Sequence, residues 1–433
     1  MEQAQAAGVI VGLVLGAVAI LGGVWKGGAW VLRRFRPSRP GPESPTQSQV
    51  IVQDPKSSGR TVVNVYGGTV SVYVDGLPQA APEVRDPFKE GQRLQQTHQH
   101  EKAIAQFEAA LAIADTDSRR GALHLHIGIS HYLSGRLLQA GGSYSEALRL
   151  FEAAADEQGR AAALGNLGLA YADRGDLNRA EEHYKQALEI DRRIDNPLGQ
   201  AQTLCNLGLA YHQRGDLDRA EAHYRPALEL HRRIDNPEGQ ANVLGNLGLV
   251  YAARGDLDRA EEHHKQALEI DRRIDNPLGQ AQTLCNLGSV YLRRGELERA
   301  QDHYEQALEI LRRIDNPLTQ ANGLMGLGLV YAARGDLNRA EEHHKQALEI
   351  DRRIDNPLGQ ANALGNLGLL AMLRGRPEEA RRLLAEALAL YERMGAGGEN
   401  PEKVRAALRR LEKAGANEKP RRRPRKPKEP PAG

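Results

Sequence analysis

Hydrophobic and polar positions in this chain recur with a period of 40 residues. The segment 249–281 reappears as 329–361 with one change, in which Asn338 stands in the place of Asp258. Such self-similarity predicts an array of repeated units and argues against separate globular domains. In this register one column is leucine and another is glycine: Leu164, Leu204, Leu244, Leu284, Leu324 and Leu364, then Gly168, Gly208, Gly248, Gly288, Gly328 and Gly368.

Each unit contains two helical stretches with recognisable ends. In one of them, Asn196 can cap a helix that takes Pro197 in its first turn, and Gly215 stands where a left-handed residue would end that helix. Asp216 then caps a second helix that runs to near Ile234. Because two antiparallel helices cannot bury an apolar face alone, we expect each unit to stack on the next.

The order of small and large residues within a unit resembles the tetratricopeptide repeat. Its period is longer than the usual ~34 residues, and in this it is similar to the repeats of kinesin light chains, of adaptors with GoLoco motifs and of bacterial signalling proteins. HEAT and armadillo arrays have similar periods but lack this pattern. The resemblance implies an all-α fold, a right-handed superhelix or α-solenoid. The matching positions are Leu204, Leu207, Gly208, Tyr211, Gly215, Ala220, Tyr224 and Ala227.

About eight repeats are expected over residues 86–394, as regular 40-residue units from residue 159 onward. A capping helix is predicted at 400–414, where Val404, Leu408 and Leu411 share one face and would cover the last repeat. The segment 415–433 is rich in Arg, Lys and Pro, which is typical of a disordered tail.

An uncharged run covers residues 6–25, within an N-terminal segment 1–32. A helix of this length spans the ~30 Å hydrocarbon layer, so we expect contact with a lipid bilayer through residues 6–25. Arg33, Arg34 and Arg36 follow the run, and by the positive-inside rule the rest of the chain would be cytoplasmic. The prediction is a single-pass protein, typical of a bacterial inner membrane.

Two further features of this run bear on its role. Gly8, Gly12 and Gly16 recur at every fourth position, which favours close helix association and a homo-oligomer. Ala17-Val18-Ala19 also fits a signal-peptide cleavage site. Cleavage there would give a soluble or secreted adaptor, and an intact N-terminus on the mature protein would exclude that alternative.

After a basic, Pro- and Ser-rich linker at 33–60, the period changes to two over residues 61–75. Valines alternate with polar residues on either side of Gly67-Gly68, which predicts a small β-hairpin with Tyr66 opposite Thr69 and Val63 opposite Val72. A lone hairpin is marginal in water, so its valine positions need a partner. That partner is either the repeat array or copies from other chains, as in the amyloid-like bacterial signalling motifs that this segment resembles.

Composition and charge exclude some classes of function. Of 433 residues 40% are hydrophobic and 4% aromatic, and two cysteines cannot form a disulfide framework. The formal charge of +2 conceals an acidic middle between two basic ends. The basic tail would contact anionic lipid, whereas nucleic acid is disfavoured because no aromatic residue accompanies these cations for base stacking.

No motif for a catalytic site, a cofactor or a metal is present in the sequence. His263-His264 and His343-His344 form pairs, but adjacent helical residues point about 100° apart and do not converge on one ion. The acidic pair Glu181-Glu182 and its repeats are interpreted as a solvent-exposed face.

The remaining candidate for function is the surface of the first helices, which the resemblance implies is a concave groove. Carboxamides along it would bind the backbone of an extended, partly apolar peptide, because each is both donor and acceptor. The same groups could instead satisfy neighbouring helices. The candidate groove residues are Asn166, Leu169, Gln202, Asn206, Leu209, Asn242, Asn246, Leu249, Gln282, Asn286, Asn322, Asn362 and Asn366.

These observations predict a membrane-anchored scaffold, not an enzyme, that binds partner proteins or peptides and mediates complex assembly. The alternative is a signalling sensor whose array controls oligomerisation through the hairpin or the transmembrane helix. A scaffold keeps its oligomeric state when a partner binds, whereas a sensor changes it.

Overall fold

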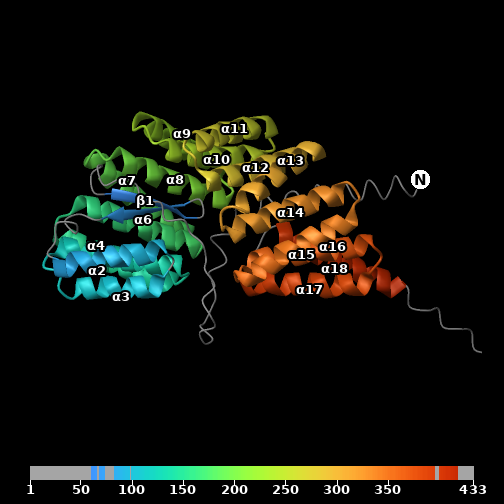
Figure 1. The fold of residues 1–433 in the computed structure, drawn as a ribbon, viewed down its shortest axis with the longest axis horizontal. Helices are drawn as coiled ribbons and strands as arrows, with labels where there is room; N and C mark the ends of the chain where they lie inside the picture. The colour runs from blue at the N-terminus through green and yellow to red at the C-terminus, as the bar shows by residue number, and fades with distance from the viewer. Residues whose placement is uncertain (1–59, 66–67, 74–81, 98, 395–398, 418–433) are drawn as a thin grey trace, which may run out of the picture.

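A computed structural model of the chain describes residues 60–65, 68–73, 82–97, 99–394 and 399–417 (Figure 1). Sixteen helices form eight antiparallel pairs of consecutive helices, and a further helix, α18 (Glu399–Asn417), packs on α17 and α16. The first helices of the pairs are α2 (Pro82–Gln96), α4 (Asp117–Leu133), α6 (Glu157–Asp173), α8 (Pro197–Arg214), α10 (Pro237–Arg254), α12 (Pro277–Arg294), α14 (Pro317–Ala333) and α16 (Pro357–Leu373). The second helices are α3 (His100–Leu111), α5 (Leu137–Ala153), α7 (Leu177–Arg193), α9 (Leu217–Arg233), α11 (Leu257–Arg273), α13 (Leu297–Leu311), α15 (Leu337–Arg353) and α17 (Pro377–Met394).

The predicted helix ends are confirmed. Asn196 caps α8, where its side-chain oxygen accepts a hydrogen bond from the Gly199 N–H at 3.1 Å, and Pro197 occupies the first turn. Gly215 ends this helix with a φ of 83°, which a residue without Cβ adopts at no steric cost. Asp216 then caps α9 through the Arg219 N–H.

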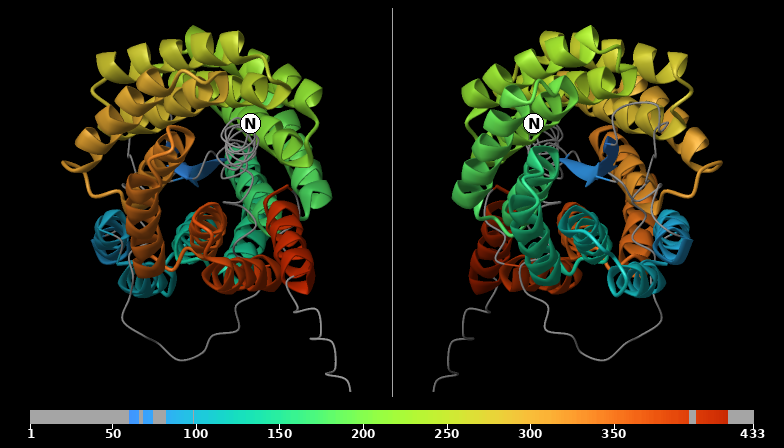
Figure 2. Two further views of the ribbon diagram at one scale, coloured as in Figure 1. Left: turned by 90° about the vertical axis from the view of Figure 1, so that its right-hand side faces the viewer. Right: turned by 90° about the vertical axis from the view of Figure 1, so that its left-hand side faces the viewer.

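The first helices lie on the inner side of a curved array. From α4 to α16 each first helix contacts the next first helix, whereas consecutive second helices are in slight contact at most among the described residues. This asymmetry curves the stack, with the first helices inside, as Figure 2 shows. The predicted solenoid of tetratricopeptide-like repeats is thus confirmed.

Adjacent helices interlock through glycine and a ring. A Cβ on Gly208 would lie 2.6 Å from the ring of Tyr224, so only glycine allows α8 to approach α9 this closely. Tyr144, Tyr184 and Tyr304 meet the same glycine column, and in two repeats a histidine, His264 or His344, takes the place of the tyrosine. All six rings are buried, so this contact forms the core of each pair.

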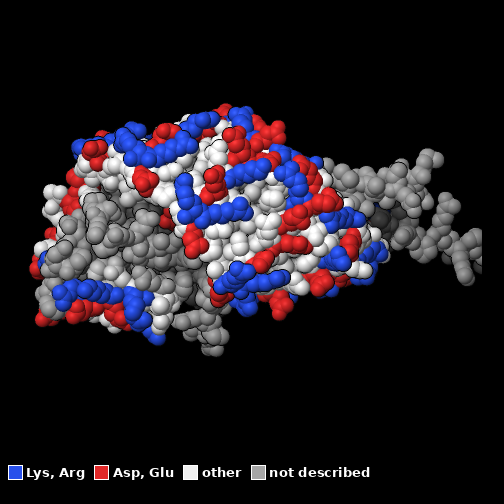
Figure 3. Space-filling view, turned by 45° about the horizontal axis from the view of Figure 1, so that its top comes forward, with Lys and Arg blue, Asp and Glu red and all other residues white. Residues whose placement is uncertain are grey.

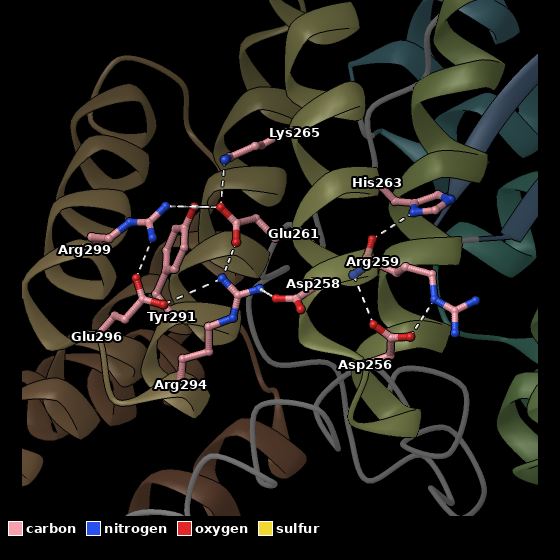
Figure 4. A network of polar contacts seen from close by, with 10 residues as sticks. All are labelled: Asp256, Asp258, Arg259, Glu261, His263, Lys265, Tyr291, Arg294, Glu296 and Arg299. Atoms are coloured by element: carbon pink, nitrogen blue, oxygen red, sulfur yellow. Dashed lines mark hydrogen bonds and ion pairs between the residues drawn. The ribbon is translucent and has the colours of Figure 1, made fainter.

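Polar contacts join each repeat to the next. Glu261 of α11 accepts hydrogen bonds from Lys265 and from the Tyr291 hydroxyl, both at 2.7 Å, and pairs with Arg294 of α12 (Figure 4). Burial opposes the ionisation of Glu261, but hydrogen bonds from Lys265, Tyr291 and Arg294 outweigh it and lower its pKa to about 2. Glu181 and Glu221 make equivalent contacts.

The interpretation of the acidic pair as a solvated face is therefore wrong for one of its two residues. Glu182 is exposed, whereas the side chain of Glu181 is only 17% exposed and bridges two repeats. Ion pairs also cover the surface: on the face in Figure 3, cationic and anionic side chains lie beside one another.

The predicted β-hairpin is present, with a different register. Strands β1 (Arg60–Val65) and β2 (Gly68–Tyr73) are antiparallel, and Val63 pairs with Val70 where Val72 was expected. Either register leaves a two-residue connection that contains Gly67, so loop length alone does not select one. Because the shift is two residues, the valines keep their alternation along the strands.

The hairpin lies against its own chain. β2 contacts α6 and also α4 and α8, three first helices, and Figure 2 shows the strands on the inner side of the array. Of the two partners considered for the hairpin, the structure thus shows the repeat array.

The predicted membrane localisation is contradicted. Among the helices of the described residues, none is long and apolar enough to cross a membrane. The run 6–25 with Gly8, Gly12 and Gly16 lies outside the described residues, as do the linker up to residue 59 and the tail from residue 418. We therefore abandon the assignment as a single-pass protein with a cytoplasmic array.

Replacing Glu261 tests the contacts between repeats. We expect Glu261→Ala to lower the free energy of unfolding by about 1–3 kcal/mol at pH 7, because Arg294 loses a largely buried partner. A carboxylate whose pKa is lowered on folding stabilises the protein above its unfolded pKa, and that stability disappears as the pH falls from about 4.5 toward 2. Urea unfolding measures the change, and the exposed neighbour Glu262→Ala is the control. Equal losses in both variants would refute the role of Glu261.

The two ring histidines make the array sensitive to acid. Burial, with a smaller contribution from His263, lowers the pKa of His264 to about 3. A histidine that stays neutral when folded takes up a proton on unfolding below about pH 6.5, so stability falls as the pH drops from 6.5 toward 3. We expect His264→Tyr to change the free energy of unfolding differently at the two pH values. The change at pH 5 should be more favourable than the change at pH 8 by roughly 2 kcal/mol.

Urea unfolding at the two pH values measures this difference. The substitution should fit without strain, because Tyr224 fills the equivalent position in another repeat. The reverse variant Tyr224→His should become acid-sensitive by a similar amount. A His264→Tyr effect that is the same at pH 5 and pH 8 would contradict the buried, neutral state of His264.

Candidate binding surface on the inner helices

The structure places the candidate groove residues on six consecutive first helices, α6 to α16. Since these helices contact one another in series, the residues follow the inner side of the array from one repeat to the next. The carboxamide column is at Asn166 on α6, Asn206 on α8, Asn246 on α10, Asn286 on α12 and Asn366 on α16. Each position recurs once per repeat because every first helix begins at an equivalent cap.

Burial of these residues differs along the array. On α6 and α8 the candidates are buried: Asn166, Leu169, Gln202, Asn206 and Leu209. On α10, α12 and α14 most of them reach solvent: Asn242 is exposed, while Leu249, Gln282, Asn286 and Asn322 are partly exposed. β2 lies along α6 and α8, but Asn246 on α10 and Asn362 and Asn366 on α16 are buried too, so burial of the candidates is not confined to the helices that the hairpin contacts.

Gln202 is the most unusual of the buried candidates. Its side chain is 3% exposed, and neither its carboxamide oxygen nor its nitrogen has a hydrogen-bond partner among the described residues. An unsatisfied buried carboxamide destabilises the fold by about 1–3 kcal/mol. Gln202 is therefore a buried polar group on α8 whose presence the contacts of the described residues do not explain.

At the C-terminal end, one candidate has a structural contact. The side-chain oxygen of Asn362 accepts hydrogen bonds from the Tyr391 hydroxyl at 2.6 Å and from Asn400 of α18 at 3.1 Å. The alternative considered for the carboxamides, that they satisfy neighbouring helices, thus describes Asn362. α18 begins one residue before the predicted cap and ends three residues after it.

The paired histidines point apart. His264 is buried against Gly248, whereas the ring centroid of His263 lies 4.9 Å from that of Tyr251. Among the described residues no group of three or more metal-ligating side chains is present. The cysteines Cys205 and Cys285 are unpaired, and burial raises the pKa of each thiol to about 12.

A column of buried carboxyl groups was missed by the sequence reading. Asp271 accepts a hydrogen bond from the Asn276 amide at 2.9 Å, and a Cβ on Gly279 would lie 2.4 Å from its oxygen. Burial raises the pKa of Asp271 to about 6 and that of Asp351 to about 7. The sequence could have indicated this column, because aspartates alternate there with large side chains at equivalent positions of the repeats. The column is Phe151, Asp191, His231, Asp271, Leu311, Asp351 and Tyr391.

Solved structures of similar fold include bacterial and archaeal repeat proteins. One is a signal-transduction ATPase of the STAND class with a tetratricopeptide repeat sensor, from Pyrococcus horikoshii. It is 15% identical to this chain with a TM-score of 0.54, and the match covers 78% of this chain and 54% of the ATPase chain. The Rap conjugation gene regulator of plasmid pLS20, in complex with the Phr* peptide, is 18% identical with a TM-score of 0.52 over 73% and 97% of the two chains. A Rap protein complexed with competence and sporulation factor is 15% identical with a TM-score of 0.50 over 78% and 99%.

Family models match most of the array. The MalT-like TPR region matches residues 235–416, and two models of the tetratricopeptide repeat match 119–193 and 200–234. No curated protein matches the chain by sequence. Together with the fold, these matches show that the chain belongs to the tetratricopeptide repeat proteins.

Proposed function

We propose that this array is a scaffold that binds an extended segment of a partner polypeptide along the inner side of its first helices. The observation that carries the proposal is the position of β2, which lies along α4, α6 and α8. A surface that accommodates one extended strand of this chain has the shape to accommodate another. The protein then acts by binding and assembles complexes, with no reaction of its own.

The chemistry of the candidate residues favours a partner with a free backbone. The carboxamide of Asn286, which is partly exposed, has both a donor and an acceptor, as an extended peptide requires. Leu209 and Leu249 add apolar contact, so a partly apolar segment is favoured over an acidic one. On α10 to α14 most of the candidate residues reach solvent, which makes this stretch the accessible part of the surface.

The similar structures are consistent with this proposal. Two of them are complexes, one with competence and sporulation factor and one with the Phr* peptide. Their identity to this chain is low and supports the fold alone. The complex with the Phr* peptide is one protein of similar fold with a peptide ligand.

A second candidate function is a sensor whose array restrains the hairpin. It is favoured by the same position of β2, because a ligand that competes for α6 and α8 would release the hairpin. A released pair of strands has unpaired edges and tends to pair with other copies. In that case ligand binding would change the oligomeric state.

The hairpin itself is the probe that tests the proposal. We expect a chain that lacks residues 60–73 to bind a synthetic peptide of residues 60–73 with a Kd at least tenfold lower than that of the full chain, where the tethered hairpin competes. Replacing Gln202 by Arg should weaken this binding by roughly tenfold, because α8 contacts β2 and a larger, charged side chain has no partner at this buried position. Isothermal titration calorimetry measures both effects, and circular dichroism confirms that each variant is folded.

Gln186→Arg is the matched control, because this exposed glutamine lies on the second helix α7, which is not among the helices that β2 contacts most. It should leave the affinity for the peptide unchanged. Absence of binding to the folded, shortened chain would refute the proposal. Sedimentation of the full chain with excess peptide separates the two candidate functions: a constant mass indicates a scaffold, and a larger mass indicates a sensor.

A further inference from the structure

One repeat lacks a tyrosine that its neighbours have. Five consecutive first helices carry a tyrosine near their C-terminal end, and α16 has Ala371 at the equivalent position. The five tyrosines are Tyr171, Tyr211, Tyr251, Tyr291 and Tyr331. The substitution removes a ring from a junction between repeats, while the helices around it keep their arrangement.

The filled junction around Tyr291 shows what the ring normally contacts (Figure 4). Its hydroxyl donates to Glu261 at 2.7 Å, and the guanidinium carbon of Arg299 lies 3.8 Å from the ring centroid. On another side, the ring centroid of His303 is 4.8 Å away. The hydroxyls of Tyr211 and Tyr251 also donate to a glutamate, each at 2.6 Å.

The glutamate of the last junction keeps its basic partners without a phenol. Glu341 of α15 pairs with Lys345 at 2.5 Å and with Arg374 at 2.6 Å, as Glu261 pairs with Lys265 and Arg294. No hydroxyl donor to Glu341 is present among the described residues, because Ala371 stands in the place of tyrosine. Glu341 therefore presents an oxygen toward the position where the other repeats place a hydroxyl.

A cavity of about 230 Å³ lies at this junction, between α15, α16 and α17. Ala371, Glu341, Lys345, Leu367, Arg374 and Leu383 are among the residues that line it. The corresponding cavity one repeat earlier is lined by residues such as Leu308, Leu324 and Ile350, and Tyr331 is not among them. That cavity measures about 290 Å³, so the two differ in position and not in added volume. The cavity at the last junction reaches Ala371 and Glu341, where Leu383 also stands in the place of His343.

The lining has the properties of a phenol site. Leu367 and Leu383 provide apolar contacts for a ring, and the Glu341 carboxylate provides the acceptor for a hydroxyl. Arg376 pairs with Glu379 and Arg352 with Glu386, each at 3.4 Å, and the remaining cation of the lining, Arg382, is exposed. Because Glu341 is the acceptor beside Ala371, a ring that carries a hydroxyl donor suits this end of the cavity. Arg376 is exposed, so a ligand can enter beside it.

We propose that this cavity binds a phenol ring supplied from outside the chain, either the side chain of a tyrosine on a partner or a free phenol. The ring occupies the place that tyrosine takes in the five preceding repeats and donates its hydroxyl to Glu341. This site is separate from the inner side of the first helices, so it does not depend on the function proposed above.

Saturation-transfer NMR with p-cresol tests the site in the full chain. We expect binding with a Kd on the order of 1 mM, as for a fragment with few atoms, and weaker binding of toluene, which lacks the hydroxyl. Ala371→Tyr fills the cavity and should abolish the p-cresol signal while raising the Tm by a few degrees. Glu341→Gln, which matches the natural Gln301 of α13, should weaken p-cresol binding roughly fivefold and leave toluene unchanged.

Tyr291→Ala is the complementary variant, since it opens the same kind of cavity beside Glu261. It should lose stability, and p-cresol should restore part of its Tm and bind with twice the stoichiometry. Equal binding of p-cresol to the wild type and to Ala371→Tyr would overturn the proposal, as would equal binding of p-cresol and toluene. N-acetyltyrosinamide distinguishes the sources: binding comparable to p-cresol supports a partner's tyrosine, and binding of p-cresol alone supports a free phenol.

Discussion

The close contact between a glycine of one helix and a ring of the next is the interaction on which the array depends. Gly208 permits it and Tyr224 fills the space, and the same pair recurs along the chain. A helix pair built in this way still has an apolar side that only another pair can cover. Stacking is therefore obligatory, and the fixed period sets every first helix at an equivalent place on the inner side. The carboxamide column follows from this geometry.

Differences between nearly identical repeats are where specific properties arise. The same position holds Tyr224 in one repeat and His264 in another, which changes the response to acid without changing the fold. Ala371 removes a ring and leaves a cavity beside an intact glutamate. Asn362, in the last regular repeat, is engaged by α18. Regular packing thus provides a constant frame in which single substitutions alter one junction at a time.

Much of the fold could be predicted from the sequence because it depends on local signals. Asn196, Pro197 and Gly215 determine where a helix begins and ends through contacts within a few residues, and the period reports the stacking directly. The hairpin was also visible, since alternation with period two is local. Its register was not, because two registers share the same alternation and a two-residue connection.

Properties that depend on the neighbouring repeat could not be predicted in the same way. Glu181 and Glu182 are adjacent and chemically alike, yet only Glu181 faces the next repeat and becomes largely buried. The buried Asp271 and the role of Asn362 likewise depend on contacts between elements that are distant in sequence. The candidate peptide-binding residues do lie on the first helices, as expected, but their role stays a prediction.

Hydrogen exchange of the full chain tests most directly whether the inner side of the first helices holds an extended strand. If β2 lies along α6 and α8, the amides of residues 60–73 exchange more slowly in the full chain than in the isolated peptide, by a factor of ten or more. An excess of the free peptide should reduce that protection, because it competes for the same helices. Exchange of these amides at the rate of the isolated peptide would contradict the proposed binding surface.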